Sequence, residues 1–258
     1  MLNKIYTVLF IIYFLISAPL LVLVSALLFV LLLPFDRKRK IQHLFSRFIS
    51  WQYFFLSPFC RVVVKGRENV NKRQAYVITS NHQSMLDIVL LYNVPLYFKW
   101  VSKKEVYRIP LVGQLLLLHG DVCIKRGDPK SARKMLQDCA AFLSQGISIM
   151  MFPEGTRSGD GKVGRFKEGA FTLAKSRGVP ILPVAIDGTR RFSNGNGGWL
   201  NARQLFQITI MPPISADEVA ASDVKALQEK AHRMVCDEHS RMLLNSVEKT
   251  SKKTSGKA

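Results

Sequence analysis

The sequence predicts an α/β fold, with a mostly parallel central sheet flanked by helices and preceded by an N-terminal hydrophobic helical segment that anchors the chain in a membrane. The first observation is an uncharged, predominantly apolar run at residues 5–33. The second is the alternation of short apolar strands with helices from residue 61 onward, which is typical of a parallel sheet. The third is that the formal net charge of +19 lies entirely after residue 36, because Lys4 and Asp36 cancel.

The run at residues 5–33 is long enough to cross a bilayer. As a helix it would reach about 43 Å, against a hydrocarbon core of roughly 30 Å, so it could span with tilt or bend at Pro19 and re-enter. A secretory signal peptide is the alternative, but its apolar region would be only about 7–15 residues long. The basic cluster at 37–40 follows at once. By the positive-inside rule it predicts that the rest of the chain lies on the cytoplasmic face, of the inner or plasma membrane in a bacterium.

Residues 41–60 are predicted to form a second helix that lies in or on the membrane. Apolar and aromatic residues dominate this stretch, and the rings of Trp51 and Tyr53 suit a membrane interface. A core helix of the following domain is the alternative, because both would show the same periodicity. The chain is therefore expected to consist of a membrane anchor with an interfacial helix at 1–60, an α/β domain at 61–245 and a basic disordered tail at 246–258.

The surplus of basic residues indicates anionic membrane lipids as partners. A nucleic-acid binder would also be basic, but the charge adjoins the apolar segments and no nucleic-acid recognition motif accompanies it. The four cysteines are widely spaced and form no CxxC pair, so a reducing compartment is expected and no zinc site or other metal site is predicted. Walker A and GxGxxG motifs are absent, so the sequence gives no case for a nucleotide cofactor.

Within the α/β domain, apolar runs bounded by turn residues define the expected elements. Two helix starts carry a capping-box pattern, Ser84 with Asp87 and Ser215 with Glu218, and the second is expected to open one long final helix. The expected strands are 61–65, 75–80, 97–102, 121–125, 147–152, 181–186 and 207–211, and two further helices are expected at 131–144 and 166–177.

The first chemically informative loop is Asn81–Asp87, between an expected strand and the helix after it. Ligands of open α/β sheets bind at the carboxyl ends of the strands, where His82 stands. A loop and one helical turn can bring the Asp87 carboxylate back to the imidazole. His82 would then act as a general base, and Asp87 would fix its tautomer. In the alternative interpretation Asp87 only caps the helix and His82 binds backbone, and this spacing alone leaves both interpretations open.

The second loop is Phe152–Ser158, directly after an apolar strand. Gly155 permits an unusual backbone angle or a close approach to a ligand. Arg157 offers a planar fork of donors suited to a phosphate. Glu154 would hold that fork in place or accept a hydrogen bond from a substrate hydroxyl. A surface turn with a solvated ion pair is the alternative, and it does not explain so many special residues after a buried strand.

Together these loops resemble the glycerophospholipid acyltransferase family, which is marked by four sequence blocks. All four occur here in order, over roughly residues 60–215. They are His82 with Asp87; the lysine-containing stretch 101–113 followed by the basic strand end 123–126; the FPEGTRS block at 152–158; and the strand with two prolines at 179–186.

The resemblance implies an enzyme that moves an acyl chain from a thioester to the free 2-hydroxyl of lysophosphatidic acid. His82 would be the general base and Asp87 its partner. The acceptor phosphate would be bound by Lys103, Arg126 and Arg157, while Gly155 and Thr156 would shape the phosphate loop. Glu154 would also belong to the substrate-binding residues. Acyl-CoA or an acyl carrier protein would be the co-substrate, and no cofactor is implied.

Two other functions remain open at this stage. A related acyltransferase could use another lysophospholipid, a lyso-aminolipid or glycerol 3-phosphate, because the four blocks do not separate these acceptors. A non-catalytic lipid-binding protein of the same fold would be expected to lose the base, whereas His82 and Asp87 are both present.

Overall fold

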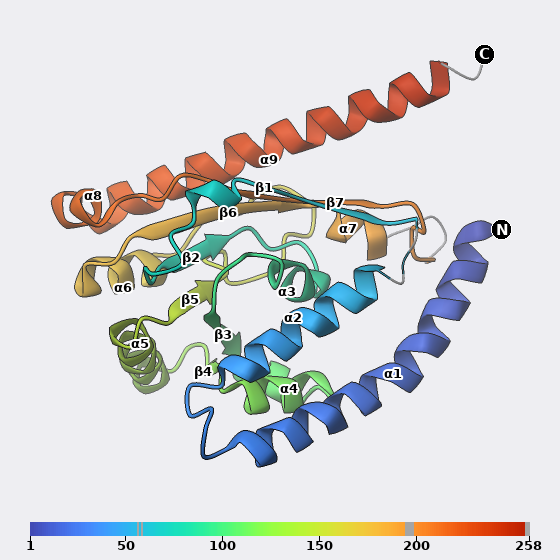
Figure 1. Ribbon diagram of the computed structural model, residues 1–258. Coiled ribbons are helices and arrows are strands. Elements are labelled where there is room, and N and C mark those ends of the chain that lie inside the picture. The colour runs from blue at the N-terminus through green and yellow to red at the C-terminus, as the bar shows by residue number, and fades with distance from the viewer. Residues whose placement is uncertain (56, 58, 194–198, 256–258) are drawn as a thin grey trace.

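The computed structural model confirms the α/β class and describes residues 1–55, 57, 59–193 and 199–255 (Figure 1). The helices are α1 (Leu2–Leu32), α2 (Lys40–Phe55), α3 (Leu86–Leu91), α4 (Val112–His119), α5 (Pro129–Ser144), α6 (Gly169–Arg177), α7 (Thr189–Ser193), α8 (Ala216–Ala221) and α9 (Val224–Ser255). The strands are β1 (Arg61–Lys65), β2 (Val77–Ser80), β3 (Phe98–Lys103), β4 (Val122–Ile124), β5 (Ser148–Met151), β6 (Ile181–Asp187) and β7 (Leu205–Ile210). Short 3₁₀ turns lie at η1 (Arg67–Asn69) and η2 (Lys104–Arg108).

These strands form one sheet in the order β1-β7-β6-β2-β5-β3-β4. Five of the six neighbouring pairs are parallel, and only β6 and β7 run antiparallel to each other. The sheet is therefore mostly parallel, as predicted. β2 and β5 are direct neighbours, so the loops that follow them leave the sheet at the same edge.

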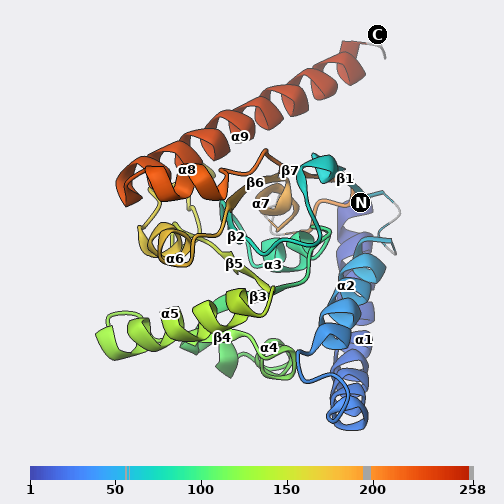
Figure 2. The ribbon, with the colours of Figure 1, turned by 60° about the vertical axis from the view of Figure 1, so that its left-hand side comes forward.

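Helices cover both faces of the sheet, and the alternation of side chains along the strands divides the core into two layers. In β5, Ile149 and Met151 face the layer built with α5, α6, α8 and α9, whereas Met150 faces the layer built with α3 and α7. Figure 2 shows α9 across one side of the sheet and α1 beside α2 at the opposite side of the domain. Burial on both faces explains why these strands are continuous apolar runs.

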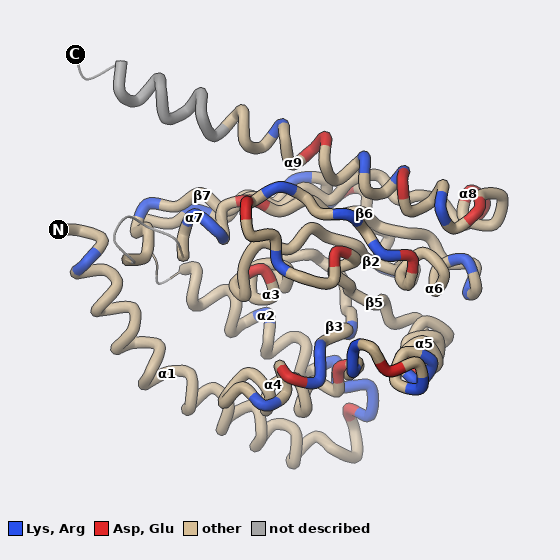
Figure 3. The backbone as a smooth tube through the Cα atoms, turned by 180° about the vertical axis from the view of Figure 1, so that it is seen from behind, with Lys and Arg blue, Asp and Glu red and all other residues tan. Residues whose placement is uncertain are grey.

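α1 is the one helix, within the described part of the chain, that is long and apolar enough to cross a membrane. It continues through Pro19 and would measure about 47 Å at 1.5 Å per residue, well beyond a bilayer core of roughly 30 Å. In Figure 3 it carries almost no charge along its length. Most of its large apolar side chains are exposed, including Leu15, Ile16 and Leu23.

Polar side chains tie α1 to α2 along much of their length. The Ser25 hydroxyl donates to Gln42 Oε1 (2.7 Å), and the Gln42 amide donates to the carbonyl of Ser25 (2.9 Å). Further along, Tyr13 donates to Gln52. Such pairs are favourable where the surroundings are apolar, because an unpaired polar group there is costly. The two helices therefore form one unit.

α2 has features of both interpretations offered for residues 41–60. One face is buried against the domain, where the Ser50 hydroxyl donates to the carbonyl of Val89 (2.7 Å). The other face exposes Phe48, Trp51 and Phe55, whose rings stack in sequence. α2 thus connects the domain to an exposed aromatic surface.

Several helix boundaries differ from the sequence predictions; the helix expected at 166–177, for example, begins at Gly169. The single long helix expected from Ser215 is wrong. α8 ends at Ala221, because the backbone of Ser222 is extended, and Asp223 starts α9 by accepting from the backbone N–H of Ala226 (2.7 Å). The helix expected from Ser84 begins instead at Leu86.

The tail predicted as disordered covers residues 246–258. α9 continues as helix to Ser255, and residues 256–258 lie outside the described residues. The stretch from 246 to 255 contains neither Gly nor Pro, so nothing in it stops a helix that has already formed.

Candidate active site

The two loops singled out in the sequence meet at one edge of the sheet. They follow the neighbouring strands β2 and β5, and a backbone hydrogen bond joins them from the Ser158 N–H to the carbonyl of His82 (2.8 Å). Sequence reasoning could place each loop at a strand end, whereas their adjacency depends on the strand order.

His82 and Asp87 form a hydrogen-bonded pair. His82 Nδ1 lies 2.8 Å from Asp87 Oδ2, and the Asp87 side chain is completely buried. The same carboxylate oxygen accepts from the backbone N–H groups of Gln83 (2.6 Å) and Ser84 (2.8 Å). Because a carboxylate only accepts, the neutral imidazole carries its proton on Nδ1 and presents the lone pair of Nε2. The pair has the geometry of a base and the group that orients it.

Aromatic stacking fixes the plane of the His82 ring. Phe152 lies parallel to it, with ring centroids 3.9 Å apart and an interplanar angle of 9°. Trp100, which is buried, stacks on Phe152 with ring centroids 5.3 Å apart. The imidazole can therefore neither tilt toward Phe152 nor rotate without breaking its bond to Asp87.

The Glu154 side chain in the second loop binds backbone groups of the first loop and of the segment after the second. One carboxylate oxygen accepts from the backbone N–H of His82 (2.8 Å) and the other from that of Gly164 (2.9 Å). Burial raises its pKa to about 6, while the two N–H donors oppose this rise and Asp87 adds to it. Sequence reasoning expected Glu154 to hold Arg157 or a substrate hydroxyl, whereas the structure commits both of its oxygens to backbone groups.

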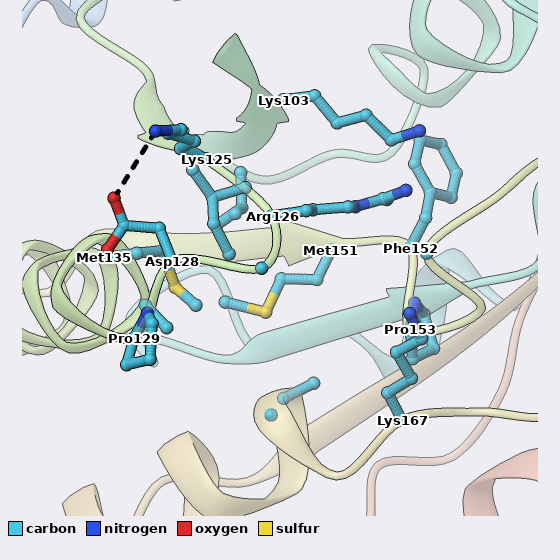
Figure 4. A pocket seen from close by; sticks show the side chains of 17 residues that line it. Lys103, Lys125, Arg126, Asp128, Pro129, Met135, Met151, Phe152, Pro153 and Lys167 are labelled. Atoms are coloured by element: carbon cyan, nitrogen blue, oxygen red, sulfur yellow. Dashed lines mark ion pairs between the residues drawn. The ribbon is translucent and has the colours of Figure 1, made fainter.

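Next to Phe152 lies a cavity of about 490 Å³ with a cationic end. Lys103, Arg126 and Lys167 line it and direct their nitrogens toward its Phe152–Pro153 end (Figure 4). Partial burial lowers the pKa of Lys103, and the charges of Arg126, Arg157 and Lys167 lower it further, against the opposing effect of Glu105. Cations gathered in this way at one end of a cavity can bind an anion.

Gly155 brings the second loop up to these cations. Its φ is +75°, a backbone conformation that would be strained in a residue with a side chain. A Cβ at this position would lie 3.1 Å from Lys167 Nζ and 3.4 Å from Arg126 Nη2. Thr156 and Arg157 are exposed, and neither lines the cavity itself. The structure thus brings Lys103, Arg126 and Gly155 together at the cavity and leaves Thr156 and Arg157 outside its lining.

The rest of the cavity is largely apolar, with the side chains of Val101, Ile124, Met135, Met151 and Ala170 among its walls. At the end away from Phe152, Lys125 turns toward Asp128, with Nζ and Oδ2 3.9 Å apart (Figure 4).

Lys167 is a site residue that the sequence analysis missed. It stands in the GRFKEGA run between the second loop and α6, and its backbone N–H donates to the carbonyl of Pro153 (2.9 Å). A basic residue so soon after the FPEGTRS block was the available signal. Among the described residues, no group of three or more His, Cys, Asp or Glu side chains could hold a metal ion.

Comparisons with known proteins agree with this geometry. The family model described as "Acyltransferase" matches residues 61–187. The chain is 40% identical over 176 residues to a chloroplastic 1-acyl-sn-glycerol-3-phosphate acyltransferase of Brassica napus, a match that covers 67% of this chain and 50% of that protein. It is 33% identical over 196 residues to a 1-acyl-sn-glycerol-3-phosphate acyltransferase of Limnanthes alba, covering 74% of this chain and 68% of that one. The chain thus spans about half the length of its chloroplast relatives.

A solved structure is similar over nearly its whole length. The crystal structure of the 1-acyl-sn-glycerophosphate acyltransferase PlsC from Thermotoga maritima superposes with a TM-score of 0.75 at 26% sequence identity. The superposition covers 93% of this chain and 97% of that one, so the likeness includes the N-terminal helices as well as the sheet.

Proposed function

The chain belongs to the acyltransferase family, and from this premise we propose that it transfers an acyl chain from an acyl thioester to the free sn-2 hydroxyl of 1-acyl-glycerol 3-phosphate, giving phosphatidic acid. The observation that carries the proposal is the His82–Asp87 pair beside a cavity with a cationic end. The pair supplies a base for a hydroxyl, and the cations supply a site for the phosphate of the same acceptor.

In the reaction, His82 Nε2 takes the proton of the sn-2 hydroxyl as its oxygen attacks the thioester carbonyl carbon. The new carbon–oxygen bond forms, the carbon–sulfur bond then breaks, and the departing thiolate takes the proton from the imidazolium. Asp87 stabilises that imidazolium through the 2.8 Å contact at Nδ1. General-base catalysis of this kind typically contributes about 10²–10⁴-fold.

Phe152 contacts both the base and the proposed phosphate site, because its ring stacks on His82 and also lines the cavity. An acceptor whose phosphate meets Lys103, Arg126 and Lys167 would direct its glycerol hydroxyl back toward His82. Arg157, exposed at the rim, would complete the phosphate contacts. Fixing acceptor and thioester in this orientation supplies much of the remaining acceleration.

The exposed apolar surfaces of α1 and α2 would keep the site at a membrane, where the acceptor and product reside. The basic cluster at 37–40 then favours the cytoplasmic face and contact with anionic lipids. Either acyl-CoA or an acyl carrier protein would serve as donor on that face.

A purified-enzyme assay tests the proposal. Wild-type protein is given lysophosphatidic acid, other lysophospholipids, a lyso-aminolipid or glycerol 3-phosphate, each with acyl-CoA or acyl carrier protein as donor. We expect transfer to lysophosphatidic acid, and a loss of at least about 10²-fold in His82→Ala with folding retained. Transfer to a different acceptor would redefine the substrate. Binding of lysophosphatidic acid without any transfer would instead identify a lipid-binding protein.

Variants of two adjacent lysines test the phosphate site, with Lys103 as the probe and Lys104 as the control. Lys103 lines the cavity, whereas Lys104 is exposed and lies outside its lining. Lys103→Ala should raise the KM for lysophosphatidic acid by about tenfold, and Lys104→Ala should leave it within twofold. Equal effects of the two variants would point to the general surface charge in place of a phosphate site.

A further inference from the structure

α9 lies outside the residues that the acyltransferase family model matches, yet its inner face contacts the first chemical loop and the segment that follows the second. Apolar residues on that face, such as Leu227 and Val235, are completely buried. Polar residues lie among them. Gln228 donates to the carbonyl of Phe166 (2.5 Å), and His232 Nε2 lies 3.1 Å from the carbonyl of Gly164.

The third of these polar residues, His239, contacts the loop of the base itself. Its side chain is 3% exposed, and its Nε2 lies 2.7 Å from the Gln83 amide nitrogen. The amide donates this bond, so the imidazole accepts at Nε2. Asp187 at the end of β6 lies farther away, with Oδ1 3.8 Å from Nε2, and its other oxygen pairs with Arg191.

Gln83 passes this contact to the catalytic pair. Its backbone N–H donates to Asp87 Oδ2 (2.6 Å), the oxygen that also accepts from His82 Nδ1. Anchoring the Gln83 side chain restricts the backbone of this residue, and so helps to hold the N–H that contacts the carboxylate. His239 is therefore two contacts away from Asp87 and three from the imidazole of His82.

Two other anchors hold the residues just before Gln83. The Asn81 amide exchanges two hydrogen bonds with the backbone of Ile186 in β6, each of 2.9 Å. Glu154 holds the backbone N–H of His82. Three successive residues are thus fixed from three different elements, and His239 supplies the last of these contacts.

We propose that His239 of α9 is a positioning residue, which holds the loop of His82 and Asp87 in its reactive geometry through the side chain of Gln83. The inference rests on the proposed function for its catalytic consequence. It predicts that the C-terminal helix contributes to turnover and not only to stability.

The test compares His239→Leu, which removes the acceptor, with His239→Gln, which keeps one. Val235→Ala is the matched control, because Val235 is buried one turn earlier on the same helix and carries no polar contact. The kcat and KM for lysophosphatidic acid and the thermal unfolding midpoint are measured for each. We expect His239→Leu to lower kcat by about tenfold to hundredfold with KM within twofold, because the buried Gln83 amide loses its partner.

His239→Gln should retain kcat within about threefold, and Val235→Ala should lower the unfolding midpoint while leaving kcat within twofold. Gln83→Leu should reduce kcat about as much as His239→Leu, and the double variant should be little worse than either one. If Val235→Ala lowers kcat as much as His239→Leu, or if the two losses multiply in the double variant, the inference is overturned.

A second readout separates this inference from the proposed function. The imidazole proton resonances of His82, assigned by their loss in His82→Asn, are recorded by NMR in wild type and His239→Leu. A shift in His239→Leu that is absent in Val235→Ala supports the positioning role even if wild type transfers no acyl chain to lysophosphatidic acid. Unchanged His82 resonances in His239→Leu would overturn it, whichever substrate the enzyme uses.

Discussion

Replacing Asp87 by Asn tests the electrostatic part of the proposed mechanism with little change of shape. Asp87 Oδ2 faces three donors, the His82 ring and the backbone N–H groups of Gln83 and Ser84. An amide nitrogen placed there would meet two backbone donors, so the Asn side chain must keep its oxygen in that position. His82 therefore keeps its proton on Nδ1, and the variant loses charge without changing the tautomer.

The size of the effect follows from the 2.8 Å separation of His82 Nδ1 and Asp87 Oδ2. At an effective dielectric constant of about 20, two unit charges at this distance attract by about 6 kcal/mol. The imidazolium charge is spread over two nitrogens and only partly formed in the transition state, so we expect about half of this, roughly 3 kcal/mol, to be lost. That loss corresponds to about 10²-fold in kcat.

The assay follows initial rates of transfer to lysophosphatidic acid in detergent, with kcat and KM separated and the unfolding midpoint recorded. KM should change by less than about twofold, because the cations of the cavity are untouched. The midpoint should fall, because the new amide nitrogen takes the place of Asp87 Oδ1, which is buried and has no hydrogen-bond partner. A loss in kcat below threefold would refute general-base catalysis through this pair. A loss near 10⁴-fold would show that the tautomer had changed.

Three further predictions concern the loops and the membrane segment. Arg157→Lys keeps the charge but loses the planar fork, so it should lower kcat/KM for lysophosphatidic acid by about tenfold and much less for an acceptor without a phosphate; equal penalties would indicate a structural role. Because burial raises the pKa of Glu154 from 4.5 to about 6, its contribution to stability falls as the pH rises through that window. The difference in free energy of unfolding between Glu154→Gln and wild type, measured in detergent, should therefore change by about 2 kcal/mol in favour of the variant from pH 4 to pH 7. A difference that stays constant with pH would contradict the shifted pKa. Deleting residues 1–36 removes no net charge, so the truncated protein should still bind anionic vesicles but be released by a high-salt wash that full-length protein resists; a truncated protein that also resists would place the main anchor in residues 41–60.

Much of the fold could be predicted because it depends on local patterns. Each expected strand is observed to within two residues at either end, because an apolar run bounded by turn residues has few other ways to be buried on both faces. The strand order, by contrast, is set by contacts between residues far apart in the chain. The break between α8 and α9 at Ser222 also escaped prediction, because a Ser-Asp pair can continue a helix or cap the next one.

For the candidate site, the sequence indicated residue types better than partners. His82 and Gly155 lie in loops that follow strands, and Asp87 lies in the first turn of α3, so a ligand can be expected near them from the fold alone. The role of Lys103 and Arg126 came only from the resemblance to the family. Glu154 shows the limit of such reasoning: its neighbour in sequence, Arg157, suggested an ion pair, yet its two oxygens bind the backbone of His82 and Gly164.

The contacts that fix the base come from elements that no local pattern connects. Asn81 is held by β6, His82 by Glu154 after β5, and Gln83 by His239 in α9. A loop held at a single point could rotate about it, whereas anchors on three successive residues leave the backbone no free rotation that preserves all three. The motif thus supplies the reacting groups, and its geometry depends on the backbone of β6, on Glu154 and on His239 of α9. A sequence that kept the four blocks but lost Asn81 and His239 would retain the fold and lose much of its turnover.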